Sequence, residues 1–395
     1  MNRAEATRLA RICLPRILRH ESGRGIVVVG GDDCDDASAG SSPTISEGDV
    51  EFKSLCRLWA GMGHVYEVSI DVPGRRRRRF IVKRVTPPPR KRRDAGDQRK
   101  ATSYAVEANF YEHLAPALIY DRGLTMPVPY HVEKNDDDDD DRVTICMSVL
   151  DGSPARRNLR DDDDGVQSVL SWLATLHAST WSSCVDLDDM IRRGLIQPVG
   201  SYWHLDTRPN EHASMSNRGW EGRLKLAARA IHERLRRDGM QCCVHGDAKD
   251  ANMLFLDHDD DDEGGGGVGK VGMYDFQYCG RAPPSVDLAY FFCVAVGDTS
   301  DDYRGYTRRY HEQLVRKLEN DMGRGGDHRA RPPTLDELED SVALALCDFQ
   351  RFLCGWGRWG SDISSVVIRV LDRLDGGNAL ESEDAYRLAM MREYG

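Results

Sequence analysis

The chain has 395 residues, enough for one large domain or two lobes and too many for a peptide hormone or a disulfide-stabilised mini-fold. Its 54 lysines and arginines face 65 aspartates and glutamates, and the net charge of −11 argues against a nucleic-acid-binding surface. Apolar residues make up 40% of the chain, and no run of them approaches the ~20 needed to cross a bilayer. We therefore expect a cytoplasmic, monomeric globular protein without a membrane partner.

The acidic residues are concentrated in four runs. Nineteen of them lie in residues 32–36, 136–141, 161–164 and 259–263. Without these runs the net charge would be +8. Contiguous aspartates lack the alternating ligands, the glycine and the terminal glutamate of a calcium-binding EF-hand loop. We interpret the runs as solvated insertions between structural elements.

The 11 cysteines show no ligand spacing. Cys242 and Cys243 form the only close pair, whereas zinc sites built from cysteine need repeated C-x-x-C spacing. We expect buried, reduced thiols and do not expect structural zinc.

The first 48 residues differ in character from the rest. Apolar residues at helical spacing predict a helix over residues 5–19, and the Gly-, Asp- and Ser-rich stretch after it predicts a mobile linker. Residues 1–48 are therefore set apart as an N-terminal helix and linker.

Residues 49–150 have the character of a β-rich domain. Alternating apolar residues predict strands over residues 50–55, 66–72, 80–85, 128–132 and 143–149. A helix is predicted over residues 104–114, and five arginines at residues 75–79 are interpreted as a solvated hairpin tip.

Residues 151–395 are richer in helical periodicity. Amphipathic patterns predict helices over residues 169–177, 224–235, 335–346, 349–359 and 366–374. Residues 184–219 show no clear period. The composition as a whole indicates an α+β protein with a β-rich front and a helical back.

The chemistry is concentrated in residues 242–277. Asp247 lies in a short turn, Asn252 follows five residues later, and Asp275 returns on a hairpin. Three converging oxygen-bearing side chains suit Mg²⁺ with a polyphosphate as co-ligand. In phosphoryl transfer, Asp247 would orient the attacking hydroxyl, and Asn252 and Asp275 would hold the metal. Lys249 would reach the transferred phosphoryl group.

These residues also resemble a known signature. His245-Gly246-Asp247 with Asn252 resembles the H-G-D-x-x-x-x-N motif of the aminoglycoside phosphotransferase and choline kinase-like superfamily, which is similar to eukaryotic protein kinases. Asp275-Phe276-Gln277 matches the kinase D-F-G by position, with glutamine in place of glycine. The run from Tyr274 to Phe292 most resembles the ecdysteroid-kinase-like, or CHK kinase-like, group.

The resemblance implies a bilobal protein-kinase-like α+β fold. Residues 49–150 would form a small nucleotide-binding N-lobe, and residues 151–395 a larger helical C-lobe for catalysis and acceptor binding. In the N-lobe, Lys83 matches the phosphate-binding lysine and Glu107 its glutamate partner, with Glu112 as the alternative partner.

Two further segments would complete the nucleotide site. Gly61 and Gly63 fall where the nucleotide-covering loop belongs, although the full G-x-G-x-x-G is absent. Residues 147–150, with Ser148 and Leu150, match the hinge whose backbone would meet adenine. ATP and Mg²⁺ are the cofactors that the resemblance implies.

The segment after Asp275 decides the class of acceptor. Only eleven residues separate Asp275 from Asp287, which leaves no room for the activation segment of a protein kinase. We therefore expect a small-molecule hydroxyl as acceptor. We expect Asp287 to brace the catalytic loop rather than bind metal, and His245 and His177 to be packed residues rather than a general base or a ligand.

The acceptor itself is not defined by the sequence. Asp348, Trp356 and Trp359 form a candidate aromatic and acidic wall for it. Two other functions stay open: a catalytically weak pseudokinase-like nucleotide-binding module, and a protein kinase. The first is disfavoured because every catalytic and nucleotide-binding side chain named above is present.

Overall fold

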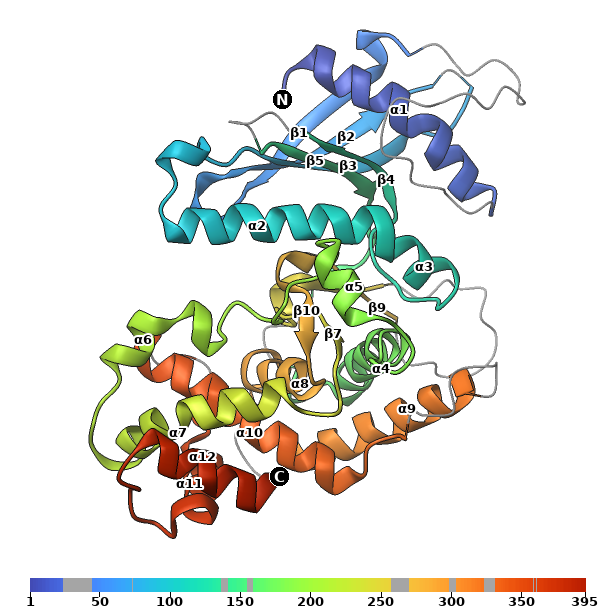
Figure 1. Cartoon of the computed structure of the whole chain (residues 1–395). Helices are drawn as coiled ribbons and strands as arrows, with labels where there is room; N and C mark the ends of the chain where they lie inside the picture. The colour runs from blue at the N-terminus through green and yellow to red at the C-terminus, as the bar shows by residue number, and fades with distance from the viewer. Residues whose placement is uncertain are drawn as a thin grey trace. The chain divides into compact units, whose positions relative to one another are not determined.

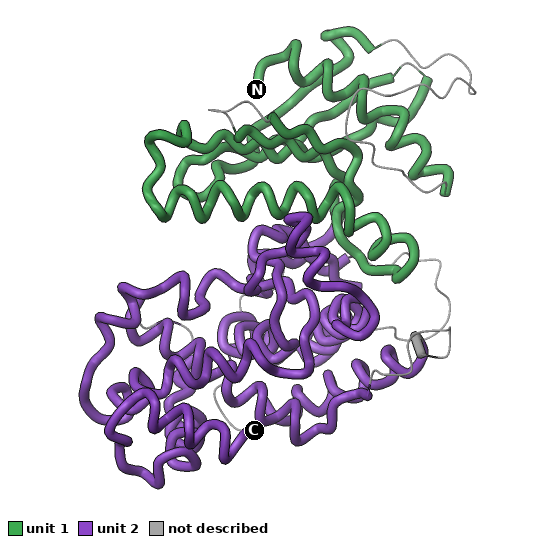
Figure 2. The backbone as a smooth tube through the Cα atoms, viewed as in Figure 1, with its two compact units in different colours: residues 1–151 green, residues 152–395 purple. Residues whose placement is uncertain are grey.

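The computed structural model describes residues 1–23, 45–72, 74–135, 141–154, 159–256, 270–297, 303–322, 331–357, 359 and 361–395. The predicted linker after residue 23 and most residues of the acidic runs, including all of 32–36 and 259–263, lie outside this part. In the described part, no helix is long and apolar enough to cross a membrane. The chain divides into two compact units, Met1–Asp151 and Gly152–Gly395 (Figure 2).

Unit 1 is built on an antiparallel sheet in the order β1-β2-β3-β5-β4 (Figure 1). Its strands are β1 (Val50–Arg57), β2 (Gly63–Ile70), β3 (Arg78–Val85), β4 (Pro129–Lys134) and β5 (Val143–Ser148). Each overlaps a strand predicted from apolar alternation in the sequence. The central strand β3 carries Lys83, which is paired with Val65 and Ile145 on its neighbours.

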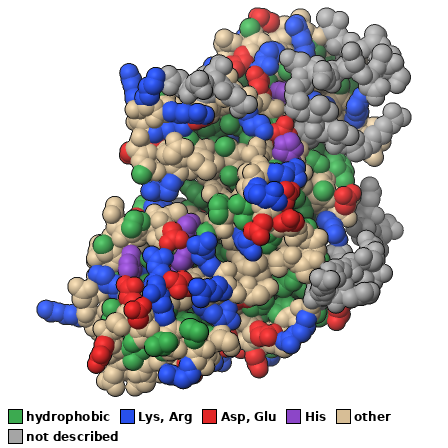
Figure 3. Space-filling view, viewed as in Figure 1, with side chains coloured by type: hydrophobic (Ala, Val, Ile, Leu, Met, Phe, Trp, Pro, Cys, Tyr) green, Lys and Arg blue, Asp and Glu red, His purple; other side chains and the backbone are tan. Residues whose placement is uncertain are grey.

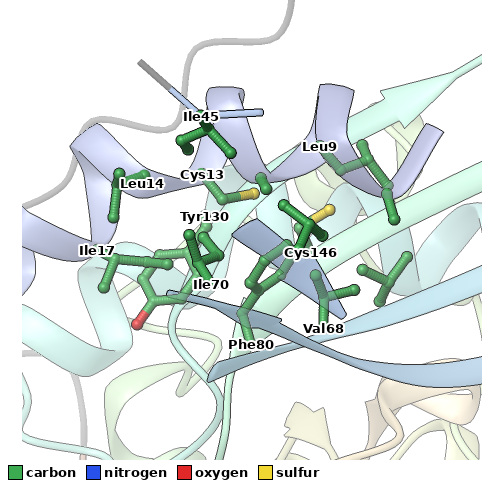
Figure 4. Packing of buried hydrophobic residues seen from close by; sticks show 14 of the residues in the cluster. Leu9, Cys13, Leu14, Ile17, Ile45, Val68, Ile70, Phe80, Tyr130 and Cys146 are labelled. Atoms are coloured by element: carbon green, nitrogen blue, oxygen red, sulfur yellow. The ribbon is translucent and has the colours of Figure 1, made fainter. Parts of the chain in front are cut away.

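Helix α1 (Arg3–Glu21) covers one face of this sheet. Its apolar stripe, including Leu9, Cys13 and Ile17, packs on Phe80 and other buried sheet residues in one hydrophobic cluster (Figure 4). Burial of each such side chain stabilises the unit by ~1.5–3 kcal/mol. The helix that the sequence analysis sets apart in residues 1–48 is thus an integral part of unit 1.

The opposite face of the sheet carries α2 (Ala95–Asn109) (Figure 1). This helix continues through a π turn (Phe110–Leu114) into α3 (Ala115–Tyr120). The predicted start at residue 104 is wrong by nine residues. Asp94 caps the helix by accepting a hydrogen bond from Asp97 N at 2.7 Å.

The arginine run that leads into β3 is tied to its surroundings. Arg78 binds Glu21 of α1 at 2.9 Å, and Arg79 binds Asp151 at 2.7 Å. Exposed ion pairs of this kind stabilise a fold by ~1 kcal/mol or less. Basic and acidic side chains are interspersed over the visible face of the molecule (Figure 3).

Unit 2 is mainly helical. Its helices are α4 (Asp163–Ser179), α5 (Leu187–Arg192), α6 (Pro209–Ser214), α7 (Gly219–Arg236), α8 (Ser285–Phe291), α9 (Tyr303–Met322), α10 (Leu335–Trp356), α11 (Ser364–Asp375) and α12 (Glu383–Tyr394). Its short strands pair β7 (Cys242–Val244) with β10 (Gly280–Ala282), and β8 (Met253–Phe255) with β6 (Ser153–Pro154) and β9 (Val271–Met273). The predicted α+β class is confirmed.

Helix α10 differs from its prediction. It runs unbroken through the two segments predicted separately, because Cys347 and Asp348 between them are helical and buried. Thr334 starts the helix with a capping box in which Glu337 N donates to Thr334 Oγ1 at 3.2 Å.

Candidate active site

The turn after β7 is held by Asp287 of α8. Its Oδ2 accepts a hydrogen bond from His245 N at 2.7 Å, and its Oδ1 accepts one from Gly246 N at 2.8 Å. His177 of α4 places Nε2 3.1 Å from Asp287 Oδ2 and Nδ1 2.7 Å from the Tyr310 hydroxyl. Asp287 and His177 are fully buried. Asp287 therefore braces the turn that carries Asp247, as the sequence analysis expects.

Gly246 is required by the geometry of this turn. Its φ is +79°, and a Cβ there would lie 2.1 Å from Tyr278 O and 2.8 Å from Ser201 N. The left-handed backbone and the close packing both exclude a side chain. The arginine found at this position in protein kinases has no space here.

His245 serves as a scaffold for the loop. The Asp247 N–H donates to its Nδ1 at 3.3 Å, so Nε2 carries the proton and donates to Tyr274 O at 3.1 Å. Burial lowers the pKa of His245, which favours this neutral form. The ring also packs on Phe276 with centroids 4.8 Å apart. With both nitrogens engaged, the imidazole is not placed to act as a base.

Asp247 is buried at the centre of the loop. Its Oδ2 accepts hydrogen bonds from Lys249 Nζ at 2.9 Å and Asn252 Nδ2 at 2.8 Å. Its Oδ1 is buried and accepts no hydrogen bond of normal distance and angle from a described residue, but the Tyr290 hydroxyl lies beside the carboxylate and interacts with it. Burial raises the pKa of Asp247, Lys249 opposes this, and the charge of Asp275 adds to it. Such an Oδ1 atom suits a group that receives a substrate hydroxyl.

Asn252 is oriented by the same carboxylate. Its Nδ2 donates to both Oδ2 and the backbone oxygen of Asp247, the latter at 2.9 Å. Both amide hydrogens are thereby used, so Asn252 Oδ1 is the atom left for a cation. The backbone oxygen of Asn252 accepts from Tyr274 N at 3.1 Å, which connects this residue to the hairpin that carries Asp275.

Asp275 has an unusual backbone conformation. Its φ of +71° and ψ of +65° are left-handed, a conformation that costs a non-glycine residue ~1–3 kcal/mol and concentrates at functional sites. The Gln277 side-chain amide donates to Asp275 Oδ1, so the residue that replaces the D-F-G glycine orients the carboxylate. A carboxylate here and the amide oxygen of Asn252 are hard ligands that fit Mg²⁺.

Lys83 and Glu107 form a buried pair within unit 1. Lys83 follows Val82 on β3 and so points to the α2 face of the sheet, where its Nζ lies 2.9 Å from Glu107 Oε1 and 2.6 Å from Oε2. The two side chains are 8% and 1% exposed. The alternative partner, Glu112, instead binds Lys134 at 2.5 Å. The structure brings together the pair that the sequence analysis preferred.

The two loop glycines have different constraints. Gly63 has a φ of +145°, and a Cβ there would lie 2.0 Å from Arg84 O on β3, so strand packing alone explains this glycine. Gly61 has a φ of +71° in the turn between β1 and β2. Gly61 is thus constrained by its turn, and Gly63 by strand packing.

The predicted hinge begins at the end of β5. Ser148 Oγ accepts a hydrogen bond from Val128 N at 2.9 Å, and Ser148 N donates to Val128 O at 2.8 Å. The Ser148 side chain is thus used within unit 1. Leu150 follows the strand, is partly buried, and directly precedes the unit boundary.

The sequence analysis missed an aromatic group beside Asp247. The Tyr202 and Tyr290 hydroxyls lie 3.0 Å apart. Burial raises the pKa of both, and the charge of Asp247 adds to this. The Arg208 guanidinium lies over the Tyr202 ring at 5.6 Å and over Trp356 at 4.8 Å. Tyr202 and Arg208 come from the segment without a period, which gave no local signal.

Only part of the predicted acceptor wall has side chains that an acceptor could contact. Asp348 is buried and binds Arg351 Nε at 2.7 Å, so its carboxylate is already compensated. Trp356 and Trp359 are 51% and 37% exposed. The aromatic part of the wall therefore lies at the surface, and the acidic part does not.

Asp287→Asn should lower stability in a pH-dependent way. Burial raises the pKa of Asp287, but bonds from His177 and the loop backbone more than offset this, so the net pKa is lowered. The stabilisation is then complete above pH ~4, the unfolded pKa, and is lost as the pH falls through the folded pKa. The amide leaves one buried donor unpaired, at a cost of ~1–3 kcal/mol.

Urea unfolding at pH 7 should therefore give a lower midpoint for Asp287→Asn than for the wild type, with a gap that narrows below pH 4. Asp121→Asn, at an exposed helix end, is the control and should unfold like the wild type. A gap that stays constant down to pH 3 would contradict the proposed bracing by an ionised carboxylate.

Comparison with known proteins assigns the chain to a family. The model of the phosphotransferase enzyme family matches residues 55–331. No curated protein sequence matches the chain. Solved structures similar to it include an amicoumacin kinase in complex with AMP-PNP, Ca²⁺ and Ami, at 14% identity over 92% of this chain and 93% of that chain, with a TM-score of 0.45.

Two other similar structures are kinases of different named acceptors. The ethanolamine kinase of Plasmodium vivax is 10% identical over 88% of this chain and 82% of that chain, with a TM-score of 0.44. The macrolide 2′-phosphotransferase of Brachybacterium faecium is 14% identical over 80% of this chain and 94% of that chain, with a TM-score of 0.40.

Proposed function

The chain belongs to the phosphotransferase enzyme family, and on that premise we propose that it transfers the γ-phosphoryl group of Mg-ATP to a hydroxyl of a small molecule. One observation supports this most strongly. Asp247 is a buried carboxylate with one oxygen held by Lys249 and Asn252, and its other oxygen accepts no hydrogen bond of normal distance and angle from a described residue. This is the arrangement that a group needs to orient a hydroxyl for in-line attack.

Each residue of the loop has a role in this proposal. Asp247 Oδ1 accepts the hydrogen of the acceptor hydroxyl. Asn252 Oδ1 and Asp275 hold Mg²⁺, which neutralises charge on the phosphate oxygens. Lys249, one-third exposed beside Asp247, contacts the transferred phosphoryl group as negative charge develops on it.

The nucleotide is bound by residues of unit 1 in this proposal. Lys83 contacts the phosphates, and Glu107 holds the lysine in position by the buried ion pair. The resemblance implies that the nucleotide site is completed by Gly61 and by the backbone from Ser148 to Leu150. Gly63 is included with less support.

A small acceptor is favoured over a protein acceptor. Between Asp275 and Asp287 the chain forms a short 3₁₀ turn (Phe276–Tyr278), then β10, which pairs with β7, and then the start of α8. This compact path leaves no peptide-docking segment. We propose that the acceptor binds beside Asp247, against Tyr202, Arg208 and Trp356. The ecdysteroid-kinase-like subgroup, a monomeric state and a cytoplasmic location stay predictions.

A screen for acceptor-dependent ADP release tests the proposal. The full chain is incubated with Mg-ATP and a panel of sugars, amino alcohols and sterols, and thermal shift with Mg-ATP is measured in parallel. We expect stabilisation by Mg-ATP and ADP release with one class of hydroxyl compound. Stabilisation without turnover would favour the pseudokinase-like module. The absence of both stabilisation and turnover would refute nucleotide use.

A further inference from the structure

A cluster of two histidines and an aspartate lies in unit 2, outside the catalytic loop. His204 and Asp206 come from the loop before α6, and His232 comes from α7. One ligand atom from each of the three lies within 4.8 Å of the others. Because imidazole nitrogens and a carboxylate oxygen meet here, the cluster has the composition of a transition-metal site.

One edge of a tetrahedral site is already formed. His232 Nε2 lies 3.1 Å from Asp206 Oδ2. Two ligands of a tetrahedral zinc ion, each ~2.05 Å from the metal, lie ~3.3 Å apart. A zinc ion would therefore replace the hydrogen between these two atoms with little movement, and the imidazole proton would then reside on Nδ1 of His232.

His204 supplies the second nitrogen and the third ligand. Its ring stacks on His232 with centroids 6.1 Å apart and an interplanar angle of 13°. Its Nδ1 is buried and has no hydrogen-bond partner among the described residues. An unpaired buried polar atom is costly, by ~1–3 kcal/mol, so its presence beside two other ligand groups calls for an explanation.

The surroundings suit a cation held by this cluster. Arg229 Nη1 donates to Asp206 Oδ1 at 2.8 Å, which fixes the carboxylate and leaves Oδ2 facing His232. Asp206 is 42% exposed, which provides access from solvent.

One contact opposes metal binding. The exposed Arg236 places Nη1 3.5 Å from Asp206 Oδ2 and would have to move away. Its long hydrogen bond is weak, and its half-exposed side chain has solvent to enter. The free energy needed to displace Arg236 from Asp206 is therefore small compared with the free energy gained from the metal–ligand bonds.

We propose that His204, Asp206 and His232 bind one Zn²⁺ ion, with water as the fourth ligand. The sequence analysis did not expect structural zinc because it considered only cysteine spacing. The ion would tie α7 to the loop that also carries Tyr202 and Arg208. Ser201 N of the same loop donates to Tyr278 O at 3.1 Å, beside Gly246, so the site would brace the wall next to Asp247.

Cobalt binding tests the proposal without nucleotide or acceptor. The full chain, stripped of metal by a chelator, is titrated with Co²⁺, whose visible absorption bands are intense in four-coordinate sites and weak in octahedral ones. We expect intense bands that saturate at one equivalent and disappear when one equivalent of Zn²⁺ is added. Weak bands, or none at saturating Co²⁺, would overturn the proposal.

Variants locate the site. Asp206→Asn and His232→Gln should each weaken Co²⁺ binding by at least about 10-fold. His113→Gln, an exposed histidine of unit 1, is the control and should bind like the wild type. Circular dichroism checks that the variants are folded. If they are not, the Co²⁺ absorption spectrum of the wild type alone tests the proposal. Unchanged affinity in folded His232→Gln would refute this ligand set.

Discussion

Asp247→Asn should reduce phosphoryl transfer by about 10²–10⁴-fold while Mg-ATP binding stays close to that of the wild type. The amide keeps the shape of the side chain, and its oxygen can still accept from Asn252 and Lys249. It has no negative charge with which to receive the proton of a hydroxyl. Acceptor-dependent ADP release measures the first effect, and calorimetric titration with Mg-ATP measures the second.

The same variant should be at least as stable as the wild type without nucleotide and metal. Because the net pKa of Asp247 is raised by burial, the folded state disfavours the carboxylate relative to the unfolded state, and the charge lowers stability at pH 7. Removing it should leave the urea midpoint unchanged or higher, and the gain should shrink as the pH falls and the wild-type carboxyl protonates. A large drop in stability would mean that the activity loss reflects misfolding.

Asp250→Asn is the matched control for this substitution. Asp250 lies three residues away on the same loop, and its carboxylate accepts a hydrogen bond from Ala251 N at 2.9 Å. Its replacement removes the same charge from the loop without touching Asp247. We expect near wild-type turnover, and a loss equal to that of Asp247→Asn would contradict the assigned role of Asp247.

Lys83→Met should destabilise the fold by roughly 3–5 kcal/mol and greatly weaken Mg-ATP binding. The substitution leaves Glu107, which is 1% exposed, without its cationic partner. Lys53→Met provides the comparison, because Lys53 is 64% exposed in its pair with Glu67 and its loss should cost ~1 kcal/mol or less. Urea unfolding followed by circular dichroism measures the stability of both variants.

A double variant separates stability from nucleotide binding. Lys83→Met with Glu107→Gln removes both buried charges and should recover most of the lost stability, because a buried ion pair adds little over neutral groups of similar size. It should not recover Mg-ATP affinity. Wild-type affinity in the double variant would show that Lys83 does not contact the phosphates.

The parts of the fold that were predictable are those with local signals. The strands of unit 1 were found because apolar and polar residues alternate in their sequence, as at Tyr66, Val68 and Ile70 on β2. The start of α2 was missed because its signal is a single capping residue, Asp94, behind a basic and proline-rich stretch. The two separate helices expected within residues 335–359 were wrong, because Cys347 and Asp348 continue the helix of α10.

The candidate site divides in the same way. Asp247, Asn252 and Asp275 are close in sequence, so their spacing alone suggested their chemistry. Tyr202 and Arg208 are far from them in sequence and come from a segment without periodicity. Their place beside Asp247 depends on long-range contacts, such as Ser201 N with Tyr278 O, that no local pattern encodes. His204 and His232 likewise belong to no shared sequence motif.

The most direct test follows the phosphoryl group itself. The full chain and its Asp247→Asn variant are incubated with γ-labelled Mg-ATP and the acceptor found in the screen, and the products are separated. We expect the wild type to place the label in a phosphate monoester of the acceptor, one for each ADP formed, and the variant to leave it in ATP. Label found only in inorganic phosphate or in protein, or equal transfer by Asp247→Asn, would contradict a small-molecule kinase that works through Asp247.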